Sequence, residues 1–194
     1  MAGVLLAAAA AGAVMNGCLH PVKKASGDTA MDAAGRRLLA EATVGSWWSA
    51  ASRAAGRMSE KYDVPDEVRS GYLVWNGNGH WKRTVVRNVT PPYGPVVEVG
   101  VLEQTILYPL TPGQVVDLGA YDCNLDYDHD TRELTARSDR EDVNFLRLNL
   151  ADDIVNNRMT PEQASHLHAR ILELENSGKS SPYMQGLRFA PDAN

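Results

Sequence analysis

The sequence predicts an α+β domain, and three observations carry that prediction. Apolar and small residues recur at helical spacing over residues 30–62. Between residues 68 and 127 the period shortens to that of β-strands, with turn residues between the apolar runs. Two more helical stripes follow near the C-terminal end. Because helices and strands are grouped along the chain and do not alternate, the sheet is expected to be antiparallel.

The first predicted element is a long N-terminal helix over residues 30–62, with Asp28 or Thr29 as its N-cap. Many residues of its apolar stripe are Ala or Gly, which lets another helix or a sheet approach closely. Trp47 and Trp48 lie about 100° apart on a helix. One ring is therefore expected in the core and the other at a partner or at lipid headgroups, unless both are core residues.

A sheet of about five or six strands is predicted next. Residues 72–75 and 80–86 flank the sequence Asn-Gly-Asn-Gly, which is typical of a β-hairpin turn. The remaining strands are expected within residues 96–108, 114–118 and 121–127.

Two helices close the predicted domain. Ser138 with Glu141 has the pattern of a capping box. Thr160, Pro161 and Gln163 mark the start of the last helix. The predicted organisation is a signal or anchor segment at 1–18, a linker at 19–29, a single domain at 30–175 and an extended tail at 176–194. In that tail Tyr183 and Phe189 are candidate partner contacts.

The composition excludes some classes of protein. A chain of 194 residues is long enough to bury a core without disulfides or metals. Its net charge of −5 argues against a nucleic-acid-binding protein, which normally carries a clustered basic face. The two cysteines, Cys18 and Cys123, cannot form a disulfide framework.

The N-terminal run MAGVLLAAAAAGAVM is uncharged and apolar, and Gly17 and Cys18 follow it closely. A helix of about 15 residues spans about 22 Å, less than the roughly 30 Å of a bilayer core. That length is typical of the apolar region of a signal peptide. Residues 1–18 resemble the lipobox segment of bacterial lipoproteins, which implies lipidation at Cys18. An uncleaved membrane anchor and a buried soluble helix are the alternatives.

An acidic segment is the candidate metal site. Counted from Asp122, oxygen-bearing side chains stand at positions 1, 3, 5, 9 and 12, namely Asp122, Asn124, Asp126, Asp130 and Glu133. This spacing resembles an EF-hand calcium loop, although Tyr127 stands where that loop has glycine. The alternatives are a strand with a solvated acidic face and a surface that attracts basic partners.

No catalytic motif is present. The chain has no Gly-x-Ser-x-Gly, no Walker loop, no His-Glu-x-x-His and no Rossmann fingerprint. No catalytic residue and no cofactor other than calcium is therefore predicted. An enzyme remains the alternative if distant residues, such as His80, Glu103 and Asp122, meet in one pocket.

The expected function is that of a non-enzymatic accessory subunit. The N-terminus predicts a membrane-anchored protein of the bacterial cell envelope, on the periplasmic side. Its expected partners are the membrane and other protein subunits of a larger membrane complex, for example a respiratory or photosynthetic one. A free-standing periplasmic binding module with the acidic calcium-type site is the second hypothesis.

Overall fold

The computed structural model describes residues 31–90 and 100–192. The predicted signal or anchor segment at 1–18, which contains Cys18, and the linker at 19–29 lie outside these residues. Within the described ranges, no helix is both long enough and apolar enough to cross a membrane.

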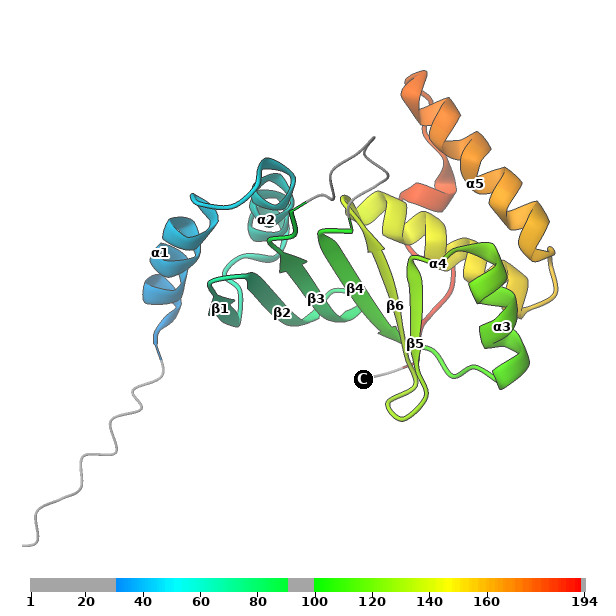
Figure 1. Ribbon diagram of the computed structural model, residues 1–194, viewed down its shortest axis with the longest axis horizontal. Coiled ribbons are helices and arrows are strands. Elements are labelled where there is room, and N and C mark those ends of the chain that lie inside the picture. The colour runs from blue at the N-terminus through cyan, green and yellow to red at the C-terminus, as the bar shows by residue number, and fades with distance from the viewer. Residues whose placement is uncertain (1–30, 91–99, 193–194) are drawn as a thin grey trace, which may run out of the picture. The chain divides into compact units, whose positions relative to one another are not determined.

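The architecture is α+β, as predicted (Figure 1). In the described part, a six-stranded antiparallel sheet has the order β1-β2-β3-β4-β6-β5. The strands are β1 Glu67–Arg69, β2 Tyr72–Asn78, β3 Trp81–Arg87, β4 Leu102–Leu107, β5 Leu125–Asp128 and β6 Glu133–Ser138. The helices are α1 Ala33–Val44, α2 Ser49–Tyr62, α3 Pro112–Tyr121, α4 Glu141–Val155, α5 Pro161–Asn176 and the short 3-10 helix η1 Pro182–Met184.

The β2–β3 hairpin forms where the turn sequence predicts it. Asn78 pairs with Trp81 across the turn. Gly77 and Gly79 have φ angles of 59° and 68°, a region that glycine enters without a steric penalty. The turn therefore sets the register of the hairpin, and the register decides which side chains face the core.

The prediction of one long helix over residues 30–62 is wrong, because the chain forms α1 and α2 with a turn between them. Gly45, a poor helix former, ends α1. The buried indole of Trp47 then donates from Nε1 to the carbonyl oxygen of Ser70 at 2.9 Å. Ser52 Oγ donates to the carbonyl of Val44 at 3.0 Å, which satisfies the end of α1.

Residues 114–118, predicted as a strand, lie instead in α3. Thr111 is the N-cap, and it exchanges capping-box hydrogen bonds with Gln114, with Pro112 in the first turn. The strand predicted over 121–127 is correspondingly shorter. Asp122 caps the C-terminus of α3, and β5 begins only at Leu125.

Helices α2 and α4 cover one face of the sheet. Under α2, the side chains of Leu73, Trp75 and Val86 form one apolar cluster with the alanines of the helix. Under α4, a second cluster contains Ile106, Leu134 and the apolar side of α4, with α3, α5 and η1 packed around that helix. The apolar stripe of α4 is buried throughout: Val143, Leu146, Leu150 and Ile154.

The predicted capping box at Ser138 and Glu141 is wrong. The N-cap of α4 is Arg140, and its side chain makes no capping hydrogen bond. Ser138 Oγ instead donates to the carbonyl of Arg140 at 2.5 Å. The Glu141 carboxylate accepts hydrogen bonds from donors on α2 and on the sheet.

The residues after α5 pack against α4. The buried amide of Asn149 donates to the carbonyls of Tyr183 and Gly186 at 2.9 and 2.8 Å. Its oxygen accepts from the backbone N–H of Arg188 at 2.7 Å. Phe189 meets the ring of Tyr108 edge-on, with ring centroids 5.3 Å apart. The segment predicted as a tail is thus tied to the domain by main-chain hydrogen bonds.

Candidate functional site

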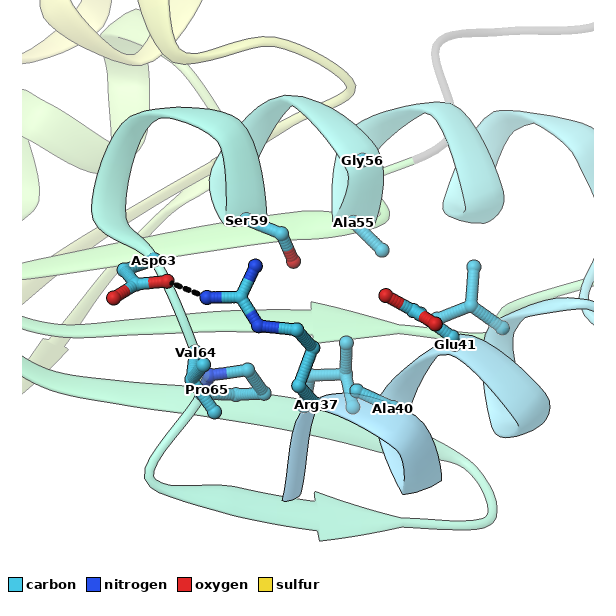
Figure 2. Close-up of a pocket in the computed structure, with 11 residues that line it drawn as sticks. Arg37, Ala40, Glu41, Ala55, Gly56, Ser59, Asp63, Val64 and Pro65 are labelled. Carbon is cyan, nitrogen blue, oxygen red and sulfur yellow. Dashed lines mark hydrogen bonds and ion pairs between the residues drawn. The ribbon is translucent and has the colours of Figure 1, made fainter. Parts of the chain in front are cut away.

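A pocket of about 160 Å³ lies between α1, α2 and the loop that follows α2 (Figure 2). Small residues at the helix contact, Ala40, Ala55 and Gly56, leave this space open. A cavity of about 150 Å³ lined by apolar side chains holds a benzene molecule. The pocket therefore has room for one apolar side chain. Its remaining lining comprises Val44, Val64, Pro65, Leu73, Arg37, Glu41, Ser59 and Asp63.

Charged side chains form one rim of the pocket. Arg37 reaches from α1 toward the end of α2, where it makes an ion pair with Asp63 (Figure 2). The Arg37 side chain is still 57% exposed. The Glu41 carboxylate lies one helical turn further along α1, on the same side of the helix. The rim thus presents both a positive and a negative group to an incoming partner.

The backbone of Asp63 is strained. Its φ of 63° and ψ of −146° lie in a region that essentially only glycine adopts. Such strain costs about 1–3 kcal/mol and tends to occur at functional sites. The strained residue stands on the rim of the pocket and pairs with α1. This coincidence makes the pocket the leading candidate site.

The face of α1 that is turned to solvent carries a separate apolar surface. Of the five exposed large apolar side chains in the described part of the chain, three lie within residues 31–39, namely Met31, Leu38 and Leu39. Leu38 is 68% exposed and Leu39 is 41% exposed. Within the described ranges, Ala40 is the only buried residue of α1. We define the α1 surface as Ala34, Arg37, Leu38, Leu39, Glu41 and Ala42.

The four predicted partner contacts occupy different settings. Trp47 is buried, whereas Trp48 is half-buried and donates its backbone N–H to Asn88 Oδ1 at 3.0 Å. Tyr183 and Phe189 lie at the other end of the domain, in the segment that packs on α4. Tyr183 also donates its hydroxyl to Asp153 Oδ2 at 2.6 Å. The tryptophans thus lie next to α1, while the tail residues serve internal contacts.

The predicted calcium ligands are spread along the β5–β6 hairpin and before it. Asp126 accepts from Arg137 at 2.9 Å, and Glu133 pairs with Lys82 and Arg83, each at 3.0 Å. Asn124 donates its side-chain amide to Asp122, and Asp130 is exposed in the turn. Among the described residues, no three acidic, histidine or cysteine side chains are arranged to hold a metal. The calcium site stays a prediction from the sequence.

Asp122 belongs to a buried polar cluster. Arg147 on α4 is 2% exposed and donates from Nε to Asp122 Oδ2 at 2.7 Å. His168 on α5 places Nδ1 2.9 Å from the hydroxyl of Tyr121 and 3.7 Å from Asp122 Oδ2. Burial alone would raise the pKa of Asp122, but the Arg147 charge and the N–H of Asn124 hold it below its usual value. The charged carboxylate therefore joins α3 to α4 and α5.

The three residues named as a possible catalytic group, His80, Glu103 and Asp122, lie in different parts of the domain. His80 is exposed in the β2–β3 turn. Glu103 lies on the sheet face opposite α2 and α4, where it accepts from Arg87 Nε at 3.0 Å. Asp122 is held by Arg147 at the end of α3.

The Glu141 cluster was missed from the sequence. Glu141 Oε1 accepts from the Tyr62 hydroxyl at 2.5 Å, from Trp81 Nε1 at 2.7 Å and from Gln104 Nε2 at 3.0 Å. Lys61 makes an ion pair with its other oxygen. These four donors come from three segments far apart in the sequence, α2, β3 and β4. No local residue spacing predicts the cluster. Its contacts join α2, the sheet and α4.

The chain matches no protein-family model, and no curated protein and no solved structure is similar enough to count as a match.

Proposed function

We propose that this chain is a non-enzymatic accessory subunit that docks on a larger membrane protein complex through the α1 surface. We further propose that its N-terminus tethers it to the membrane of a bacterial cell envelope, on the periplasmic side. One observation carries the docking role: α1 exposes Leu38 and Leu39 while it buries a single residue, Ala40, within the described structure.

The physical argument concerns the stability of α1. An isolated helix of 12 residues is marginal in water, and most helical stability in proteins comes from burying an apolar face. Here Leu38 is 68% exposed and Leu39 is 41% exposed. Burying one leucine side chain contributes about 1.5–3 kcal/mol. A partner that covers this face would therefore stabilise the helix and the assembly together.

The pocket supports the same role. It opens between α1 and α2, where α1 contributes Arg37, Ala40, Glu41 and Val44, and its interior is mainly apolar. One apolar side chain of a partner fits its volume, with Arg37 and Glu41 at the rim to fix the orientation. Buried anchors of this kind, surrounded by a polar rim, are typical of protein–protein interfaces.

The tether is supported by the N-terminal sequence. The uncharged apolar run and Cys18 resemble a lipoprotein signal, and α1 follows them along the chain. Purification of the native protein from membranes in mild detergent, with intact mass measurement, tests this part. Mass added at Cys18, or retention of Met1 with extraction only by detergent, is expected. Release of an unmodified chain without detergent would overturn the tether.

Site-specific photo-cross-linking tests the docking role. A photoreactive amino acid replaces Leu38 in the full chain, and the matched control replaces Val116 on α3, which is 72% exposed. Position 38 is expected to give one discrete adduct in intact membranes, and position 116 none. Absence of an adduct at 38, or the same adducts from both positions, would contradict the proposal.

A further inference from the structure

The outward face of α1 is a narrow apolar stripe. Ala34, Leu38 and Ala42 stand four residues apart, so they lie on one face at successive turns. All three are exposed, and Ala40 on the opposite side is the residue that contacts the core. The alanines on either side of Leu38 permit close approach of another helix, since the distance between packed helices depends on side-chain size.

Two opposite charges flank this stripe in a fixed order. Arg37 and Glu41 are also four residues apart, so they lie side by side along one edge of the stripe. More than half of the Arg37 side chain remains exposed beyond its ion pair with Asp63. The Glu41 carboxylate makes no ion pair or hydrogen bond with another described residue. A partner that pairs with both side chains would carry a negative and a positive group in the reverse order.

We propose that the α1 surface is a two-fold interface, on which α1 of a second copy of this chain lies antiparallel. An antiparallel copy reverses the order of the charges, so Arg37 of each copy stands opposite Glu41 of the other. Contacts across a two-fold axis require one surface to complement itself in this way. The proposal rests on the docking role proposed above: the subunit of the larger complex that meets the α1 surface is a second copy of this chain.

The size of the surface sets the strength of the interface. A helix of 12 residues is about 18 Å long. A contact between two such helices falls below the roughly 1,200 Å² of total buried area that marks stable complexes. The dimer is therefore weak and concentration-dependent. Its leucines meet at the centre, and the charges at the edge fix the antiparallel orientation.

Charge reversal gives the test. The full chain is purified in mild detergent as wild type, Arg37→Glu and Glu41→Arg, and self-association is followed by sedimentation velocity and native mass spectrometry. Either variant alone places like charges opposite each other at both ends of the interface. Its dimer is expected to weaken about tenfold. An equal mixture of the two variants is expected to form the heterodimer with near wild-type affinity.

The matched control reverses an exposed pair elsewhere. Arg170 and Glu173 form an ion pair at 3.0 Å on α5, and both side chains are largely exposed. Arg170→Glu and Glu173→Arg are expected to leave self-association unchanged, alone and mixed. Arg37→Glu also loses the ion pair with Asp63, so a weaker dimer of this variant alone has two explanations. The decisive results are therefore the dimer affinity of Glu41→Arg and its recovery in the mixture.

The outcomes separate this proposal from the docking role. A wild-type chain that stays monomeric, or single variants that dimerise as well as wild type, would overturn the two-fold interface. If the photoreactive residue at position 38 then captures a different polypeptide, the docking role stands without the dimer. An adduct of two copies of this chain, lost in Glu41→Arg, supports the two-fold interface.

Discussion

At Glu141, one carboxylate joins three parts of the structure. Its four donors come from Lys61 and Tyr62 on α2, Trp81 on β3 and Gln104 on β4. Hydrogen bonds to a charged group are worth about 1.5–3 kcal/mol, and losing one leaves the buried partners unsatisfied. This residue also stands in the first turn of α4, where a negative charge is favourable.

Glu141→Gln is expected to lower the free energy of unfolding by about 2–3 kcal/mol, because the neutral amide replaces the charged acceptor of four donors. Urea denaturation near neutral pH measures this change. Glu60→Gln, an exposed position on α2, is the control and is expected to have little effect. Equal stability of the two variants would contradict the structural role of Glu141.

The same residue predicts a pH dependence. Burial alone would raise the pKa of Glu141, but the bonds from Lys61, Tyr62, Trp81 and Gln104 hold it below the usual 4.5. Because the folded pKa is the lower one, the stabilisation is present above pH 4.5 and is lost as pH falls through the folded pKa. The stability difference between wild type and Glu141→Gln should therefore shrink in acid. A constant difference would show that the charge is not its source.

The backbone strain at Asp63 predicts a substitution that raises the free energy of unfolding. Asp63→Gly relieves a backbone conformation that costs about 1–3 kcal/mol, while it loses only an exposed ion pair. The free energy of unfolding is expected to rise by about 1 kcal/mol. Arg37→Ala, which removes the ion pair alone, is the control, with a loss of less than about 1 kcal/mol. A less stable Asp63→Gly variant would contradict the strain.

At the scale of elements, local signals decide what a sequence can predict. Residues 111–114 read Thr-Pro-Gly-Gln and residues 160–163 read Thr-Pro-Glu-Gln, and both form capping boxes. The second predicts the start of a helix, whereas residues 114–118, which follow the first, are predicted as a strand. The first capping pattern was the signal that could have found α3. Burial of Leu118 and Tyr121 in the core overrides the strand propensity of Val115 and Val116.

The candidate site was harder to predict than the fold. The break between α1 and α2 depends on the hydrogen bond from the Trp47 indole to the carbonyl of Ser70, which lies 23 residues further along the chain. The pocket exists only because of that break. The Glu141 cluster likewise depends on contacts that span 19 to 80 residues of sequence. Hydrophobic periodicity describes one element at a time and carries no information on such contacts.

The segment after α5 behaves as an element of the domain. Asn149→Ala removes three hydrogen bonds to this segment and leaves the backbone groups of Tyr183, Gly186 and Arg188 without that partner. The free energy of unfolding is expected to fall by about 2–4 kcal/mol. Limited proteolysis should cut the variant first after α5. Asn156→Ala, an exposed position whose amide bonds to Asp152 one helical turn earlier, is the control. A variant as resistant as wild type would show that Asn149 does not hold the segment.

At the scale of the whole molecule, the residues that stabilise the fold and the surface proposed to bind a partner lie in different elements. The clusters under α2 and α4 share Tyr62 and meet at the Glu141 carboxylate, so both should unfold together. Helix α1 contributes the buried Ala40 and the partly buried Val44 to the first cluster, and most of its other residues are exposed. Elements with few buried apolar contacts open at low free energy. The α1 surface is therefore the part whose order depends most on a partner.

Amide hydrogen exchange of the full chain over a series of protein concentrations tests this account most directly. The two-fold interface predicts fast exchange of the α1 amides in dilute protein and slower exchange as the concentration rises. The amides of α4 are expected to exchange slowly at every concentration. Slow exchange in α1 that does not depend on concentration would contradict the claim that this helix needs a second copy to complete its packing.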